Sequence, residues 1–162
     1  MEYFPALLSR AESYAAIVRI EAHFERFGFG LWAAELRESE ELIGFIGLSV
    51  PAFKAAFTPC VEIGWRLARE QWGRGLATEG ARAVAHHAFE ELRLQALVSF
   101  TAPANARSRR VMEKLGMVRN VMEDFDHPHL PDGHRLKRHV LYRLSHGEWE
   151  IKGATGKASV EP

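Results

Sequence analysis

The chain has 162 residues, 47% of them hydrophobic and 26% charged, and its 21 basic residues balance its 21 acidic ones. This length suits one globular domain with a real core, and the zero net charge argues against a nucleic-acid partner. Cys60 is the only cysteine, so no internal disulfide forms and a reducing, cytoplasmic setting is expected. No apolar run approaches the ~20 residues of a membrane span and no signal peptide is evident, so no membrane partner is expected.

A helix is predicted first, over residues 9–27. Ser9 and Glu12 have the spacing of a capping box, in which a hydroxyl and a carboxylate cap the first helical turn. Apolar residues then recur at roughly helical spacing, and Gly28 supplies the stop that commonly ends a helix.

The middle of the chain alternates between strand and helix signals. Two short apolar segments, 31–37 and 42–50, predict a β-hairpin across a polar turn. Apolar and other residues alternate over 61–67, which predicts a strand. Farther on, apolar residues at helical spacing over 81–92 predict an amphipathic helix.

The second half of the chain also contains strand and helix signals. A nearly continuous apolar run over 96–102 predicts a buried central strand. A short helix is predicted over 105–115, because Asn105 suits its N-cap and Gly116 its C-terminal stop. Two closing strands follow, over 117–125 and 139–144.

The predicted elements run helix, hairpin, strand, helix, strand, helix and two strands. This order predicts an α/β (α+β) fold, in which a mixed sheet is covered by helices. A single domain is expected over residues 1–148. Residues 149–162 are predicted to form a flexible tail, because they are rich in small and polar residues.

The stretch 72–78, Trp-Gly-Arg-Gly-Leu-Ala-Thr, lies directly between a predicted strand and a predicted helix. Its glycines permit a sharp turn, and the first free N–H groups of the helix make an anion site suited to a diphosphate. Arg69 and Arg74 are placed to add charged hydrogen bonds. An ordinary strand-to-helix turn is an equally good interpretation, since the stretch matches neither a Walker loop nor Gly-x-Gly-x-x-Gly.

The second motif, residues 105–117, follows the buried strand. Asn105 and Ser108 are three residues apart and lie on one side of the first helical turn, where they could face a ligand at the carboxyl end of the strand. The competing interpretation is that Asn105 only caps the helix and Ser108 only fills its first turn.

Taken together, the stretches 62–67, 71–79 and 105–117 resemble the GNAT superfamily of N-acetyltransferases, in its RimJ/RimL-type branch of ribosomal-protein N-terminal acetyltransferases. The resemblance covers about residues 3–144 and implies a mostly antiparallel central sheet flanked by helices. The resemblance further implies that this chain lacks the family's first strand and part of its first helix. A shortened chain, a misassigned start codon and a replacement segment all stay open as explanations.

The resemblance implies acetyl-CoA as co-substrate and no metal. The diphosphate would bind the backbone amides from Gly73 to Thr78, and the pantetheine would lie between the strands at 62–67 and 96–102. The residues implied to bind acetyl-CoA are Leu67, Arg69, Trp72, Gly73, Arg74, Gly75, Ala77, Thr78, Asn105 and Ser108.

The resemblance also implies an acyltransferase that moves acetyl directly to a primary amine. Glu62 is the candidate base, and a strand carboxylate paired with Arg66 is the alternative. Ser108 is the candidate proton donor to the leaving thiolate, in place of the tyrosine that is frequent in the family. The acceptor is a protein N-terminus or a small amine, and a homodimer is compatible with the family. A non-catalytic acyl-CoA-binding module and an interaction domain of the same fold stay open as alternatives.

Several other side chains give weaker indications of function. Cys60 is expected to be inert because no histidine lies beside it in sequence. Histidines between 127 and 139 lack metal-ligand spacing and favour a polar loop, although Asp126 or His127 could contact the acceptor. Three aromatic residues are further candidates for an acceptor pocket or for plain core packing: Trp32, Trp65 and Phe53.

Overall fold

The computed structural model describes residues 8–157, with side chains described as far as residue 151. Its strands are β1 (Leu31–Glu35), β2 (Leu42–Ser49), β3 (Glu62–Leu67), β4 (Ala96–Thr101), β5 (Val118–Arg119), β6 (Phe125–Asp126) and β7 (Arg138–Ser145). Its α-helices are α1 (Arg10–Phe27), α2 (Leu76–His86), α3 (Ala106–Leu115) and α4 (His146–Lys157). Shorter helical pieces are η1 (Arg69–Gln71), η2 (His87–Glu91), which continues α2 with π-helical turns, and η3 (Val121–Glu123).

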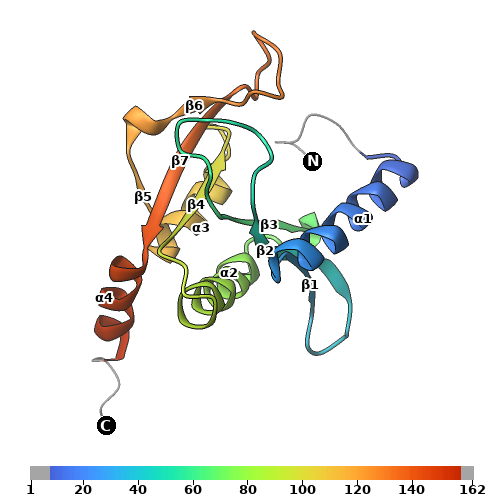
Figure 1. Cartoon of the computed structure of the whole chain (residues 1–162). Helices are drawn as coiled ribbons and strands as arrows, with labels where there is room; N and C mark the ends of the chain where they lie inside the picture. The colour runs from blue at the N-terminus through green and yellow to red at the C-terminus, as the bar shows by residue number, and fades with distance from the viewer. Residues whose placement is uncertain (1–7, 158–162) are drawn as a thin grey trace.

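Helix α1 confirms the prediction made from its capping box. The backbone N–H of Glu12 donates to the Ser9 hydroxyl over 3.2 Å, and the N–H of Ser9 donates to the Glu12 carboxylate over 2.7 Å. Gly28 ends the helix with a φ of +74°, which a residue with a side chain rarely adopts. The helix stands to one side of the sheet (Figure 1), and no residue in it is fully buried.

The sheet has the strand order β1-β2-β3-β4-β7-β5, and β6 also pairs with β7. Every neighbouring pair is antiparallel except β3 and β4, which run parallel. The predicted fold, a mixed and mostly antiparallel sheet flanked by helices, is therefore confirmed (Figure 1). In the described residues no strand precedes α1, and β1 is the outermost strand on its side.

Helices α2 and α3 cover the centre of the sheet, α2 against β2 and β3 and α3 against β4. The core between them is apolar and almost completely closed to solvent. Its largest fully buried side chains include Leu48, Ile63, Phe89, Leu97 and Met112. Burial of this apolar surface stabilises the positions of β3 and β4 in the sheet.

The described part of the predicted tail is helical. Residue 149 lies inside α4 rather than at the start of a tail, and the Trp149 ring packs 5.8 Å from the Phe89 ring. Helix α4 begins at a second capping box, in which Glu148 accepts hydrogen bonds from the N–H and hydroxyl of Ser145. The last five residues of the expected tail lie outside the described residues.

The strand predicted over 117–125 is broken into β5 and β6 by the short helix η3. Asn120 causes the break, because its side chain accepts a hydrogen bond from the N–H of Met122 and so caps η3. A side chain that bonds its own backbone in this way competes with strand pairing.

Candidate active site

The parallel strands β3 and β4 meet at one end and separate at the other. Glu62 is aligned with Val98, and the N–H of Val98 donates to the Val61 carbonyl over 2.9 Å. No other pair joins these two strands among the described residues, although β3 continues to Leu67 and β4 to Thr101. The carboxyl halves of β3 and β4 therefore leave an opening in the middle of the sheet.

Backbone groups of β3 point into this opening. The N–H of Ala68 donates to the Ile43 carbonyl over 2.7 Å, so the even-numbered residues of this segment bond to β2. Because strand residues alternate in direction, Trp65 and Leu67 turn their N–H and carbonyl groups toward β4. Part of this edge is used within the chain, since the Trp72 indole N–H donates to the Leu67 carbonyl over 2.9 Å. The N–H of Leu67 therefore faces the opening, and its role in binding a ligand stays a prediction.

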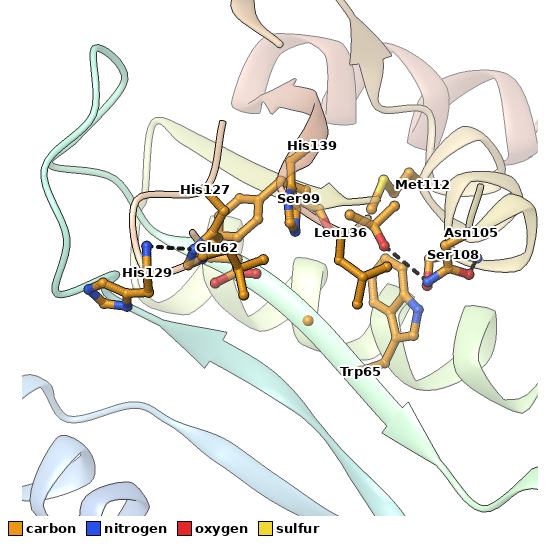
Figure 2. A pocket seen from close by; sticks show the side chains of 14 residues that line it. Glu62, Trp65, Ser99, Asn105, Ser108, Met112, His127, His129, Leu136 and His139 are labelled. Carbon is orange, nitrogen blue, oxygen red and sulfur yellow. Dashed lines mark hydrogen bonds between the residues drawn. The ribbon is translucent and has the colours of Figure 1, made fainter. Parts of the chain in front are cut away.

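A cavity of about 380 Å³ occupies the opening and the space above it (Figure 2). It brings together three of the predicted residues, Glu62, Asn105 and Ser108, which come from β3 and the start of α3. The remaining lining residues are Gly64, Trp65, Ser99, Phe100, Thr101, Met112, His127, His129, Leu130, Leu136 and His139. The cavity thus joins a carboxylate, a hydroxyl and an amide to an apolar and aromatic wall.

Glu62 is held in the cavity wall with one hydrogen-bond partner of its own. The Ser49 hydroxyl, across the β2–β3 pair, donates to its carboxylate over 3.2 Å. Loss of hydration raises the pKa of Glu62 to about 7, and the Ser49 hydrogen bond opposes this shift. A carboxylate with such a pKa is suited to accept a proton near neutral pH.

The space beside Glu62 is open, as predicted from Gly64. A side-chain carbon added at Gly64 would meet no atom within 4 Å, so substrate can approach the strand there. Arg66, the alternative partner of Glu62, has its guanidinium over the Phe45 ring at 5.4 Å.

Asn105 caps α3, as predicted, and its side chain also positions Ser108. The Asn105 carbonyl oxygen accepts a hydrogen bond from the N–H of Ser108 over 3.2 Å. Its amide nitrogen donates to the hydroxyls of Ser108 and Thr101, each over 3.0 Å. Since the Ser108 oxygen accepts from Asn105, its own O–H remains available to donate into the cavity.

The glycine-bearing turn lies at the carboxyl end of β3 and leads into α2. Gly73 and Gly75 have φ angles of +78° and +85°, and both are exposed with open space where a side chain would begin. Within the described part of the chain, the N–H groups of residues 73–77 have no hydrogen-bond partner. The predicted cradle extended to Thr78, but the Thr78 N–H donates to the Gly75 carbonyl over 2.9 Å. The amides available to an anion are therefore those before Thr78.

Three arginines lie around this turn. Arg69, in η1, and Arg74 are both exposed, and Arg74 donates to the Gln71 side chain. Arg107 places its guanidinium 4.9 Å from the centre of the Trp72 ring. Arg107 was not among the predicted ligands, although it lies only two positions after Asn105 in the second motif.

Aromatic rings form the far wall of the cavity. His127 and His139 lie 5.1 Å apart between ring centres, and Phe100 is 6.0 Å from His139. The pKa of His127 falls to about 4, mainly because the ring loses hydration, and the other two histidines nearby lower it further. Burial also lowers the pKa of His139. Both rings are therefore neutral at pH 7.

Not every acceptor-side prediction lies at the cavity. His127 and Trp65 line it, and Phe53 lies behind it, 4.9 Å from the His127 ring. Asp126 instead pairs with Arg138 at the surface over 3.3 Å. Trp32 lines a separate hollow against α2.

The first 118 residues match the family model described as an acetyltransferase (GNAT) domain. This is most of the chain. The protein belongs to the GNAT family of acetyltransferases. A solved acetyltransferase from Agrobacterium tumefaciens is 30% identical and has a TM-score of 0.65 to this GNAT chain, covering 87% of it and 74% of its own length. The ribosomal-protein-S5-alanine acetyltransferase of Vibrio fischeri has a TM-score of 0.70, with 91% of this chain and 80% of its own length covered. Because the two sequences are only 16% identical, this likeness shows a shared fold and nothing more.

Curated relatives extend the likeness in sequence. This GNAT chain is 34% identical to the FsC-acetyl coenzyme A-N(2)-transacetylase of Aspergillus fumigatus, over 75% of the chain and 52% of the fungal protein. It is 32% identical to the uncharacterized N-acetyltransferase YnaD of Bacillus subtilis, over 70% of the chain and 63% of that protein. The chain therefore spans between about half and two thirds of the length of these relatives.

Three further features concern the Cys60 thiol, metal-ligating side chains and the length and polarity of the helices. Desolvation raises the pKa of the Cys60 thiol to about 11, and the nearby Glu62 carboxylate adds to the shift, which agrees with an inert thiol. No group of three or more metal-ligating side chains occurs in the described residues of this GNAT domain. No helix among residues 8–157 is both long and apolar enough to span a membrane.

Proposed function

We propose that the protein is an N-acetyltransferase that transfers acetyl from acetyl-CoA to a primary amine by direct attack. One observation carries the proposal: the opening between β3 and β4 has Glu62, with a pKa of about 7, at its closed end and a turn with unpaired amides at the other. The family supplies the acetyl chemistry, and these two features supply a base and an anion site.

In the proposed complex, the diphosphate accepts hydrogen bonds from the amides of residues 73–77, and Arg69, Arg74 and Arg107 surround it with positive charge. The pantetheine arm enters the opening beside Leu67, whose N–H faces it. Asn105 and Ser108 then lie near the thioester end, since both line the cavity that contains Glu62.

The reaction requires an amine without its extra proton, because a protonated amine has no free electron pair. Glu62 accepts that proton, and the amine nitrogen attacks the thioester carbon. The backbone N–H of Leu67 is placed to stabilise the oxyanion that forms. The carbon–sulfur bond then breaks as Ser108 donates its proton to the leaving thiolate, and the proton that the attacking nitrogen loses restores the Ser108 hydroxyl, so that an amide and CoA leave.

Finer assignments are part of the same proposal. Trp72 at the head of the turn supports the RimJ/RimL-type branch, and the single cysteine supports a cytoplasmic location. The acceptor class includes protein N-termini and small amines. A homodimer is a further proposal, which light scattering of the purified protein tests.

Binding and turnover test the proposal separately. CoA should raise the melting temperature of the purified protein, and acetyl-CoA with an accepted amine should release free thiol. Stabilisation by CoA with no turnover for any primary amine would favour a non-catalytic acyl-CoA-binding module. No stabilisation by CoA would favour an interaction domain of the same fold.

A pair of glycine variants isolates the anion site. Gly73→Ala places a side chain at a φ of +78° in the turn, and Gly133→Ala does the same at an identical angle in a distant loop. Each should lose about 1 kcal/mol of stability from backbone strain. Only Gly73→Ala should reduce the stabilisation by CoA, because only that turn presents amides to the diphosphate.

A further inference from the structure

We propose that the acceptor of this enzyme is a primary amine whose nearest substituent is aromatic and uncharged, held against a cluster of rings beyond Glu62. The ring cluster comprises Phe53, Phe57, Phe100, Phe125, His127 and His139. The inference rests on the proposed function, since it names the acceptor class of the same site.

The ring cluster is built from four separate segments of the chain. Phe53 and Phe57 come from the loop between β2 and β3, Phe100 from β4, Phe125 from β6 and His139 from β7. Rings from different segments contact one another directly.

The distances show how tightly these rings are joined. Phe57 and Phe125 are 4.7 Å apart between ring centres, and Phe100 and Phe125 are 5.4 Å apart. Phe53 lies 4.9 Å from His127, and Phe125 lies 5.6 Å from His139. Edge-to-face and stacked contacts at such distances stabilise ring pairs and would accept one more ring in the same way.

Phe100, His127 and His139 form the inner surface of the cluster, because they line the cavity that also contains Glu62 and Gly64. Figure 2 shows Glu62, His127 and His139 among the lining side chains. The phenylalanines behind them hold these three rings in place. A substrate with its nitrogen at Glu62 therefore directs its next carbon atoms toward rings and toward Leu136, which is also in the wall.

Charge on the cavity wall argues against a second charged group on the acceptor. No lysine or arginine lines the cavity in the described residues, so a carboxylate next to the amine would find no cation. Glu62 is the only acidic residue of the lining and is engaged by the reacting nitrogen, so a second ammonium would find no anion. Burying either charge without a partner is unfavourable.

Two ion pairs occupy the loop residues that precede β7 and the end of β6. Lys137 pairs with Asp132 and also donates to the Leu130 carbonyl over 3.1 Å. Arg138 pairs with Asp126 over 3.3 Å, and both side chains are more than half exposed. Neither pair lines the cavity.

A panel of amines tests the inference with the whole protein and acetyl-CoA. It contains 2-phenylethylamine, a peptide that begins with phenylalanine, butylamine, 1,4-diaminobutane and free phenylalanine. The first two carry the same aromatic chemistry from a small molecule and from a protein N-terminus, so they separate these sources. We expect kcat/KM for at least one of them to exceed that of the other three about 10-fold or more, the range in which apolar pockets discriminate.

Binding to the CoA complex gives a second readout that needs no turnover. Calorimetry with CoA present should show 2-phenylethylamine or the peptide binding more tightly than 1,4-diaminobutane and free phenylalanine. Selective binding without turnover would sustain the ring cluster as an amine site while refuting the proposed activity. Equal or reversed preference in both readouts would overturn the inference whether or not the enzyme is active.

A charge variant sharpens the result. His129 lines the cavity but is exposed, so His129→Asp should fold normally and place a carboxylate beside the rings. The ratio of 1,4-diaminobutane to 2-phenylethylamine binding should rise at least about 10-fold, since a charge partner is then available. His86→Asp makes the same substitution on the exposed side of α2 and should leave the ratio unchanged. A ratio unchanged in both variants would contradict the proposed position of the acceptor.

Discussion

Strand β4 is bonded very differently on its two sides. Toward β7 it forms a continuous antiparallel ladder, with six aligned pairs from Ala96 and Ser145 to Thr101 and Val140. Toward β3 it is aligned only where Glu62 meets Val98, and the strands then part. Backbone groups of β4 are paired along its whole length on the first side, whereas on the second the two strands leave an opening.

Side chains follow the same division. The closed β4–β7 seam is lined by buried apolar residues such as Leu97 and Leu144, which face each other in register. The open β3–β4 seam carries Glu62, Gly64 and the start of α3 with Asn105. Stability therefore concentrates on one side of β4 and binding chemistry on the other. The following variants test this division.

The largest effect is expected from Glu62→Gln at the open seam. We expect kcat/KM for the amine to fall about 10²–10⁴-fold, because the variant removes the proposed base. In the wild type, kcat/KM should rise with pH through about 7, since only the ionised carboxylate accepts a proton. Steady-state kinetics across pH 5.5–9, taken as roughly two units around that pKa, check both. A variant that keeps the wild-type rise would contradict the role of Glu62.

The same variant should be more stable than the wild type at alkaline pH. Folding raises the pKa of Glu62 from 4.5 to about 7, so the folded state binds more protons between these values and wild-type stability falls as pH rises through them. At pH 8 the difference amounts to at most ~3 kcal/mol, from ~1.4 kcal/mol per pKa unit. Thermal melts of the two proteins should coincide near pH 4.5, diverge as pH rises to about 7, and keep a constant difference above that.

A core substitution in the closed β4–β7 seam should lower stability and leave acetyl-CoA binding unchanged. Leu144 is 1% exposed and lies in the main core, so Leu144→Ala should lower the free energy of unfolding by about 2–5 kcal/mol. KM for acetyl-CoA should stay unchanged in the fraction that remains folded. Urea unfolding measures the first effect and kinetics at low temperature the second. Val118→Ala on the exposed surface of β5 is the control and should be nearly neutral.

Asn105→Ala should affect both stability and binding, but less. Loss of the N-cap costs about 1 kcal/mol of stability. KM for acetyl-CoA should also rise about 10-fold, as expected for one lost hydrogen bond and a disordered Ser108. Asn120→Ala removes a comparable asparagine cap from η3 and should leave KM unchanged. Equal KM values in the two variants would mean that Asn105 serves only the helix.

The smallest effect is expected from Cys60→Ser. Its thiol has a pKa of about 11, so almost no thiolate is present at pH 7. Activity should be unchanged, and iodoacetamide should modify the wild-type thiol only slowly, as followed by mass spectrometry. Rapid modification or loss of activity would reveal a reactive thiol at the open seam.

Local signals in the sequence were sufficient for much of this architecture. Ser9, Glu12 and Gly28 define α1, and the alternation around Ile63 and Trp65 predicts β3. These signals work because capping and strand alternation involve residues only a few positions apart. A matching Ser-x-x-Glu signal at Ser145 and Glu148 was present but overlooked, which is why a tail was predicted in place of α4.

Only part of the candidate site could be predicted from the sequence, because local signals join residues a few positions apart. Glu62, Asn105 and the glycine turn belong to contiguous motifs, so they could be named from the chain alone. The meeting of Glu62 and Asn105 at one cavity, the Ser49 partner of Glu62 and the pKa of about 7 depend on which strands pair and how much water is excluded.

Contiguous residues thus specify the helices, the turn that offers amides and the family to which the chain belongs. The separation of β3 from β4 and the ring cluster arise only after folding. The reason is physical: a cap or a turn is stabilised by neighbours along the chain, whereas an open seam and an aromatic wall exist only when segments up to 86 positions apart, Phe53 and His139, are packed into one core.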